Sequence, residues 1–320
     1  MSAETRQQQA TSKYDRLIAA AKAVPAVPTI VVHPCDETSL RGTIESAEAG
    51  IIRPILVGPA RKIREVASKH GLDISGFEIV DAAHSEEAAT RGVELIHAAR
   101  GEMLMKGSLH TDELMRAVTA KVGGLRTERR ISHVFVMDVP AYDETLLVTD
   151  AAINIFPDLD AKRDIIQNAI DLYNQAGFGK TPRVAILSAV ETVTTKIPST
   201  IEAAALCKMA DRGQITGGLL DGPLAFDNAI DAEAARIKGI KSEVAGRAQI
   251  LVVPDLEAGN MLAKNLAYFA KADGAGIVLG ARVPVVLTSR ADTPRARMAS
   301  CAVAALYANA RRQHAPTIAA

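Results

Sequence analysis

The chain has 320 residues, with 37 Lys+Arg and 37 Asp+Glu, so its formal net charge at pH 7 is zero. Hydrophobic residues make up 48% and aromatic residues 3% of it, a balance that argues against a disordered chain. The absence of a global positive charge and the few aromatic rings argue against a nucleic-acid-binding protein, although basic residues can still gather locally. A chain of this length is expected to form about two domains.

Location and metal binding follow from three further features. The longest apolar runs have only strand length, so we expect no membrane span. The first residues, MSAETRQQQATSKYDR, contain no apolar signal-peptide core, and we expect a cytoplasmic protein. Cys35, Cys207 and Cys301 lie far apart and the seven histidines are dispersed, so neither a disulfide framework nor a metal site is predicted.

Apolar runs of strand length alternate with helical patterns along almost the whole chain. One helix is expected to begin at residues 199–202, which match the S-x-x-E capping-box pattern, and to end at Gly213. The last helix is expected to begin with Thr293 as N-cap and Pro294 in its first turn. Strands are expected at residues 29–32, 54–57, 77–80, 133–137, 183–187, 218–220, 250–253 and 285–288.

This alternation predicts an α/β fold with mostly parallel sheets and helices on both faces. The glycines and charges of GGLRTERR, residues 123–130, favour a domain boundary there. We expect the final helix to return to the first domain. The predicted division is a discontinuous first α/β domain, residues 1–128 plus 289–320, and a second α/β domain, residues 129–288.

In sheets of this kind ligands bind at the carboxyl ends of strands, and one strand end leads through VVPDLEAGN, residues 252–260. A glycine at 259 would let a ligand approach the backbone, and the side chain of Asn260 both donates and accepts hydrogen bonds. Helix capping by Asp255 or Asn260 explains the same residues equally well. Both interpretations stay open.

A second strand end places Ser289 and Arg290 before a helix N-terminus. Backbone N–H groups, the hydroxyl and the guanidinium can together bind an oxyanion such as phosphate. We favour this anion site over a surface pair between Arg290 and Asp292. A third stretch holds Lys106 and Arg116, which could add positive charge for a polyanionic ligand, although a solvated helix face explains them as well and is favoured locally.

Five longer motifs resemble those of the phosphate acetyl/butyryltransferase family. They are KIPSTIEA (196–203), KMADRGQITGG (208–218), DGPLAFDNAI (221–230), VVPDLEAGN (252–260) and VPVVLTSRAD (283–292). The resemblance covers nearly the whole chain and is closer to the phosphate butyryltransferase branch. It implies two α/β/α domains similar in fold to isocitrate and isopropylmalate dehydrogenases, an active site in the interdomain cleft, and a homodimer.

The same resemblance implies reversible transfer of a short acyl group, acetyl or butyryl, between CoA and inorganic phosphate. CoA or acyl-CoA is then a substrate, and we expect no permanently bound cofactor, no metal, no nucleic acid and no membrane partner. The resemblance assigns catalysis to Ser289, Arg290 and Asp150, and substrate binding to Lys106, His110, Thr111, Arg116, Asp255, Gly259 and Asn260.

One position departs from the family pattern. An acidic residue seven positions after the motif serine, proposed as base for the CoA thiol, is replaced here by Ala296. A thiol with a pKa of about 8.5 is still partly ionised at pH 7, so we expect direct transfer in a ternary complex with Ser289 as a hydrogen-bond donor. The alternatives are a decarboxylating NAD(P)-dependent dehydrogenase of similar fold and a non-catalytic acyl-CoA/phosphate-binding protein.

Overall fold

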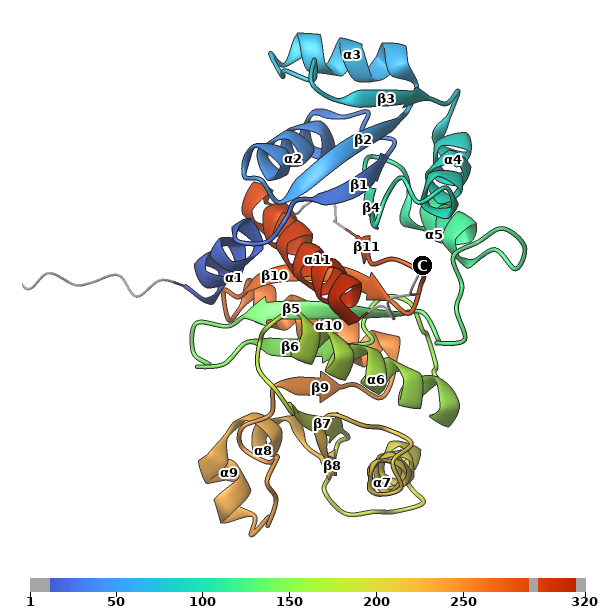
Figure 1. Ribbon diagram of the computed structural model, residues 1–320. Helices are drawn as coiled ribbons and strands as arrows, with labels where there is room; N and C mark the ends of the chain where they lie inside the picture. Colours follow the sequence, from blue (N-terminus) through green and yellow to red (C-terminus); the bar gives the residue numbers. More distant parts are fainter. Residues whose placement is uncertain (1–11, 288–292, 315–320) are drawn as a thin grey trace, which may run out of the picture.

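The computed structural model describes residues 12–287 and 293–314 of the chain. Its strands are β1 (Val27–Val32), β2 (Ile52–Gly58), β3 (Glu78–Asp81), β4 (Met103–Lys106), β5 (Ser132–Asp138), β6 (Leu146–Thr149), β7 (Arg183–Leu187), β8 (Leu219–Leu224), β9 (Ile250–Val252), β10 (Asp273–Leu279) and β11 (Val285–Val286). They form one sheet in the order β3-β2-β1-β4-β11-β10-β5-β6-β9-β7-β8 (Figure 1).

Most neighbouring strands of this sheet are parallel, as predicted. The antiparallel pairs lie in the middle, where β10 runs against both β11 and β5, and β5 runs against β6. All eight expected strands are present, and β4, β6 and β10 add to them. The first two have only four residues each, and β10 begins Asp-Gly-Ala-Gly, a composition that strands ordinarily avoid.

The helices are α1 (Lys13–Lys22), α2 (Glu37–Glu48), α3 (Ala60–Lys69), α4 (Ser85–His97), α5 (Thr111–Thr119), α6 (Leu159–Gln175), α7 (Pro198–Asp211), α8 (Phe226–Ile230), α9 (Ala232–Ile237), α10 (Leu256–Tyr268) and α11 (Pro294–His314). In the part of the chain that the structure describes, none of them combines the length and the apolar composition of a membrane span.

The capping box expected at the start of α7 is wrong. Ile197 is the N-cap and Pro198 the first helical residue, which suits proline because the N–H it lacks would have no partner there. Ser199 is therefore already inside the helix. Glu202, the expected second member of the box, instead forms an ion pair with the buried Lys162 of α6.

The other expected helix ends are confirmed. Gly213 follows the last residues of α7 with a φ of +73°, a conformation that glycine adopts without strain. At the start of α11 the backbone N–H of Ala296 donates to Thr293 Oγ1 over 3.1 Å, so Thr293 is the N-cap.

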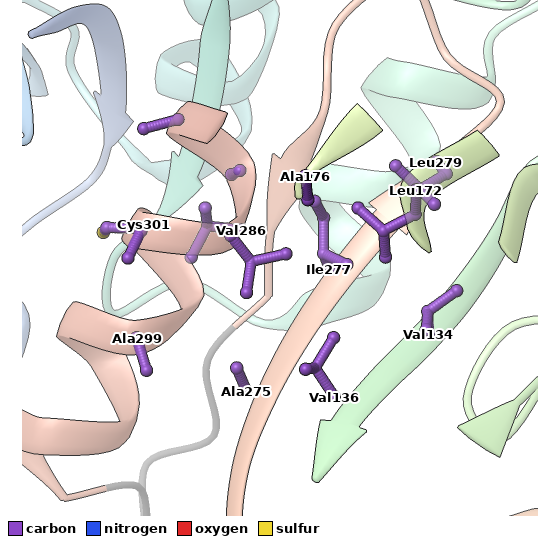
Figure 2. Packing of buried hydrophobic residues seen from close by; sticks show 14 of the residues in the cluster. Val134, Val136, Leu172, Ala176, Ala275, Ile277, Leu279, Val286, Ala299 and Cys301 are labelled. Atoms are coloured by element: carbon purple, nitrogen blue, oxygen red, sulfur yellow. The ribbon is translucent and has the colours of Figure 1, made fainter. Parts of the chain in front are cut away.

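The two faces of the sheet are covered differently. On the first face, α1, α2, α3, α6, α7 and α11 share one continuous apolar cluster with the sheet. Figure 2 shows its centre, where Val136 of β5 and Ile277 of β10 lie near Leu172 of α6 and Ala299 of α11. On the second face, α4 and α5 cover one half and α8, α9 and α10 the other, in two separate clusters.

The sheet continues across the expected domain boundary. The two-residue strand β11 pairs with β4 on one side and with β10 on the other. Helix α11 packs against α1 and α2 as well as against β10 (Figure 1). The division into residues 1–128 plus 289–320 and residues 129–288 stays a prediction.

Candidate active site

The register of the central strands places Lys106, Gly276 and Phe135 in one row on the second face of the sheet. Gly276 of β10 is paired with Phe135 of β5. The row next to it consists of Met105, Val286, Ile277 and Val134, which are paired in this order across β4, β11, β10 and β5. Lys106 comes one residue after Met105, so it lies on the same face as Phe135, three strand spacings or roughly 14 Å away.

The predicted residues of the first half gather at the carboxyl end of β4. Lys106 is only 5% exposed, and its ammonium donates to the carbonyl oxygen of Gly107 over 3.3 Å. His110 is the N-cap of α5 and Thr111 its first residue, both at the surface. Arg116 is exposed and pairs with Glu86 at 3.4 Å, as the solvated-face interpretation expects. Substrate binding by these four residues stays a prediction.

Two residues beside Lys106 were not indicated by the sequence. Ser108 Oγ donates to the carbonyl oxygen of His33 over 2.8 Å and lies 3.0 Å from His33 Nδ1. His33, at the end of β1, has a φ of +55°, which is unusual outside glycine. Burial, and secondarily the charge of Lys62, lowers the pKa of His33. A histidine directly after an apolar strand was the only sequence signal for this contact.

Asp150 follows β6 and is buried, with both carboxylate oxygens occupied. Oδ1 accepts from the backbone N–H groups of Ala152 and Ile153, each at 3.0 Å. Oδ2 accepts from the side-chain amide of Asn154 at 2.6 Å and from its backbone N–H at 3.3 Å. Four donors therefore hold this carboxylate, and within the described residues its contacts are those of a loop anchor.

Of the three predicted residues at the start of α10, Gly259 and Asn260 lie against this loop and Asp255 is the N-cap of the helix. Asp255 Oδ1 accepts from the backbone N–H of Ala258 over 2.9 Å, which confirms the helix-capping interpretation for Asp255. A Cβ at Gly259 would come within 2.7 Å of Val253 and 3.0 Å of the carbonyl oxygen of Asp150. Asn260 donates to the carbonyl oxygen of Ala151 over 3.3 Å. The structure thus brings Asp150, Gly259 and Asn260 together; their binding roles stay predictions.

His133 of β5 is a further polar residue that the prediction missed. It is 2% exposed, and its Nδ1 has no hydrogen-bond partner among residues 12–287 and 293–314. Its Nε2 lies 3.0 Å from where a Cβ on Gly276 would stand. Burial lowers the pKa of His133 well below its usual range, against the opposing charge of Asp150, so the imidazole is neutral at pH 7. A histidine inside an apolar run was its sequence signal.

A cavity of about 300 Å³ lies between α10 and the central strands, and we call it the α10 groove. Its floor is formed by Phe135 and Met137 of β5 and by Gly274 of β10. A Cβ at Gly274 would lie 3.2 Å from Met137 Sδ. The missing side chain of this glycine therefore leaves space above the floor of the groove. The wall on α10 is a stripe at helical spacing, made of Asn260, Ala263, Lys264, Ala267 and Tyr268.

The opposite wall of the α10 groove comes from the first turn of α11. Thr293 and Ala296 both line it, so the position where the family motif has an acidic residue faces this space. Ser289, Arg290 and Asp292 lie outside the described residues, in the segment that joins β11 to Thr293. The predicted phosphate site therefore stays a prediction.

The described residues contain no group of three His, Cys, Asp or Glu side chains arranged to hold a metal ion. The three cysteines are buried or half-buried. Burial raises the pKa of the Cys35 and Cys301 thiols to about 11 and that of Cys207 to about 12.

These raised pKa values predict slow thiol chemistry in the folded protein, because the thiolate is the reactive form. At pH 8 we expect a thiol-reactive disulfide dye to label the native chain slowly and to label all three cysteines at once after unfolding in guanidinium. Rapid labelling of the native chain, with mass spectrometry locating it at Cys207 or Cys301, would contradict this burial.

Comparisons with known proteins give the context of this site. The family model described as "Phosphate acetyl/butaryl transferase" matches residues 85–305, more than half of the chain. A phosphate acetyltransferase of Rhizobium meliloti is 73% identical over 94% of this chain and 95% of its own length. This chain belongs to the phosphate acetyl/butyryltransferase family. The predicted family and the enzyme class, acyltransferase, are confirmed.

Other members of the phosphate acetyl/butyryltransferase family refine this result. A phosphate butyryltransferase of Clostridium beijerinckii is 42% identical over 93% of this chain and 98% of its own length. Of these two relatives, the acetyltransferase is the more similar in sequence. This pair therefore does not confirm the expectation that the chain is closer to the butyryltransferase branch.

Solved structures show the same fold. A branched-chain phosphotransacylase from Enterococcus faecalis superposes with a TM-score of 0.76 at 27% identity, covering 88% of this chain and 98% of its own. The expected likeness was to isocitrate and isopropylmalate dehydrogenases; the dehydrogenase found here, at the level of fold alone, is a 4-hydroxythreonine-4-phosphate dehydrogenase from Klebsiella pneumoniae. That chain has a TM-score of 0.55 at 14% identity, with 89% of this chain and 98% of its own covered.

Proposed function

We propose that this enzyme transfers an acetyl group reversibly between CoA and inorganic phosphate, within a ternary complex and without an acyl-enzyme. One observation carries the proposal: the buried Lys106 and Phe135 lie in the same row on one face of the sheet. Phe135 is part of the floor of the α10 groove. A cation suits the phosphate, and an apolar groove suits the uncharged part of a thioester substrate.

Acetyl is preferred over butyryl in this proposal because the 73% identical relative is named a phosphate acetyltransferase. The test is release of free thiol from acyl-CoA on addition of phosphate, with acyl chains from two to five carbons. We expect the largest kcat/KM with acetyl-CoA. No thiol release with any chain would favour a non-catalytic binding protein, and NADP reduction with a 2-hydroxy acid would favour a dehydrogenase.

The proposed reaction needs no strong base. The CoA thiolate, present at a small fraction at pH 7, attacks the carbonyl carbon of acetyl phosphate, and phosphate leaves with the bonding electron pair. In the opposite direction, from acetyl-CoA to acetyl phosphate, the attacking phosphate is already an oxyanion, and CoA leaves as the thiolate. Ser289 would donate a hydrogen bond to the reacting carbonyl or phosphate, and most of the acceleration would come from orientation. Trapping an acyl group on Ser289 would contradict this scheme.

Arg290 is proposed to bind the phosphate. Arg290→Ala should raise the phosphate KM or lower kcat by about tenfold or more, because a charge-assisted contact is worth about 1.5–3 kcal/mol. Arg61→Ala is a matched control, because Arg61 is an exposed arginine of α3 that pairs with Glu65. If the two variants had equal steady-state kinetics, Arg290 would not bind the phosphate.

The remaining parts of the proposal concern assembly. We propose two α/β/α domains with the active site in the cleft between them, a homodimer, a cytoplasmic location and no permanently bound cofactor. The family resemblance supports the cleft and the homodimer, and the two separate apolar clusters on the second face of the sheet support the two domains.

A further inference from the structure

We propose that a second pocket, at the C-terminal end of α11, binds a small phosphate monoester at a place apart from the active site. The pocket has a volume of about 230 Å³, and the arginines that line it are Arg282, Arg311 and Arg312. We call it the arginine pocket. The inference goes beyond the proposed function and does not depend on it.

Arg311 is held in place by contacts that leave most of its donors free. Its Nη1 donates to the backbone carbonyl oxygen of Arg282 over 3.1 Å, and its guanidinium carbon lies 5.8 Å from the centroid of the Tyr307 ring, over the face of that ring. Within residues 12–287 and 293–314, these contacts use one of the five N–H donors of the guanidinium. The other donors can bind an oxyanion in the pocket.

Arg282 is positioned by a histidine of α4. Its Nη1 lies 3.0 Å from His97 Nδ1, and His97 Nε2 lies 3.1 Å from the carbonyl oxygens of both Gly123 and Gly124. Carbonyl oxygens only accept hydrogen bonds, so Nε2 carries the hydrogen and Nδ1 accepts from the arginine. A neutral His97 thus fixes the guanidinium of Arg282 without cancelling its positive charge.

The arginine pocket carries a surplus of positive charge. Arg312 is compensated, because its Nε forms an ion pair with Glu102 and its Nη1 donates to Asn309 Oδ1 over 3.0 Å. In the described part of the chain, no carboxylate forms an ion pair with Arg282 or Arg311. Two like charges therefore line one small space, and a bound dianion would offset their repulsion.

The helix dipole does not account for all three arginines. Cations in the last turn of a helix are stabilised by the partial negative charge there, which explains Arg311 and Arg312 of α11. Arg282 belongs to the segment that joins β10 to β11, so the dipole gives no reason for its place in this pocket. An anionic ligand shared by the two segments accounts for both.

The size and the remaining lining of the pocket restrict the ligand. A phosphate monoester carries a charge of about −1.5 to −2 at pH 7 and three acceptor oxygens on one group, so it can bridge two guanidinium groups better than a single carboxylate can. Val283, Pro284 and Ala308 line the rest of the pocket and suit a short carbon chain. Its volume is below the range of about 300–1,000 Å³ typical of drug-sized ligands, so we expect an ester of about two to four carbons.

The arginine pocket and the predicted active site lie at opposite ends of the same strands. Glu102 precedes β4 and Pro284 precedes β11, and the backbone N–H of Leu104 donates to the carbonyl oxygen of Pro284 over 3.1 Å. Lys106 is at the other end of β4, four residues from Glu102 or roughly 13 Å away. The pocket is therefore away from the carboxyl ends of the strands, where the substrates are expected, and we expect its ligand not to compete with them.

Calorimetric titration of the whole chain with glycerol 3-phosphate at low ionic strength tests the proposal. Arg282→Gln and Arg311→Gln should each raise the Kd for this ester by about tenfold, a loss of about 1.4 kcal/mol, because each removes a charge-assisted contact. Arg247→Gln is the matched control, since Arg247 is an exposed arginine outside the pocket that has no ion pair within the described residues. Its Kd should equal that of the wild type.

Arg290→Ala distinguishes the arginine pocket from the proposed phosphate site. We expect the Kd of this variant for glycerol 3-phosphate to match that of the wild type. Loss of binding in Arg290→Ala, together with full binding in Arg282→Gln and Arg311→Gln, would place the ester at the active site and overturn the proposal.

Two further outcomes would also overturn it. One is the absence of any binding of glycerol 3-phosphate to the wild type. The other is an equal affinity for succinate, a short dicarboxylate, which would show that the pocket does not select a phosphate group. The titrations need no acyl transfer, so their result stands whether or not the chain releases thiol from acetyl-CoA.

Discussion

Replacing Asp150 by alanine is expected to lower the free energy of unfolding by about 3–5 kcal/mol, a large part of the 5–15 kcal/mol typical of a folded domain. Four hydrogen bonds converge on this buried carboxylate, from the backbone of Ala152, Ile153 and Asn154 and from the Asn154 side chain. Alanine leaves these donors without their acceptor, and each buried unpaired group costs about 1–3 kcal/mol. Urea unfolding followed by circular dichroism measures the difference.

The Asp150→Asn variant shows how much of the stability loss comes from the negative charge and how much from the lost hydrogen-bond acceptors. Its carbonyl oxygen can still accept from Ala152 and Ile153, but its amide would face the amide of Asn154, donor against donor. We therefore expect a loss between zero and that of alanine. If Asp150→Ala unfolds at the same urea concentration as the wild type with an unchanged m-value, the loop does not depend on this carboxylate.

Gly259→Val is expected to destabilise the protein by about 1–2 kcal/mol, although valine is a better helix residue than glycine. A Cβ at this position would already lie 2.7 Å from Val253 Cγ2 and 3.0 Å from both Ala151 Cβ and the carbonyl oxygen of Asp150. Two further methyl groups would push α10 away from the loop. Overpacking costs about 1–3 kcal/mol and outweighs a propensity gain below 1 kcal/mol.

The same displacement should reach the site, because Gly259 adjoins Asn260, which lines the α10 groove. Glu257→Val is the control, a β-branched substitution in the same turn that stays exposed. Thermal unfolding of the two variants in parallel gives the comparison. A midpoint for Gly259→Val equal to that of Glu257→Val would show that α10 does not need the close approach.

Periodicity and turn residues were enough to predict the α/β class, eight strands and the start of α11, because these features depend on local sequence. Strands β6 and β10 escaped prediction because pairing across the sheet, and not propensity, makes them strands. The capping box at Ser199 failed because Pro198 already occupies the first helical position, and a four-letter pattern does not show which residue begins the helix.

The site was predictable only where residues follow strands. Asp150 lies over a hundred residues before Gly259 and Asn260 in the sequence, and only the fold shows that the three residues are neighbours. The α10 groove could not be predicted, since it depends on Gly274 and the α10 stripe facing each other across space. His33 and His133 were missed for the same reason, because a single histidine carries little information before its neighbours are known.

The position of α11 has a consequence for synthesis on the ribosome. This last helix packs against α1, the first helix of the described chain, and β11 supplies the neighbour of β4. A nascent chain that has emerged only as far as residue 130 therefore has an unpaired edge at β4 and no cover over α1 and α2. The N-terminal half must wait for almost the entire chain before its core closes, so translation pauses late in the message would prolong the exposure of that edge.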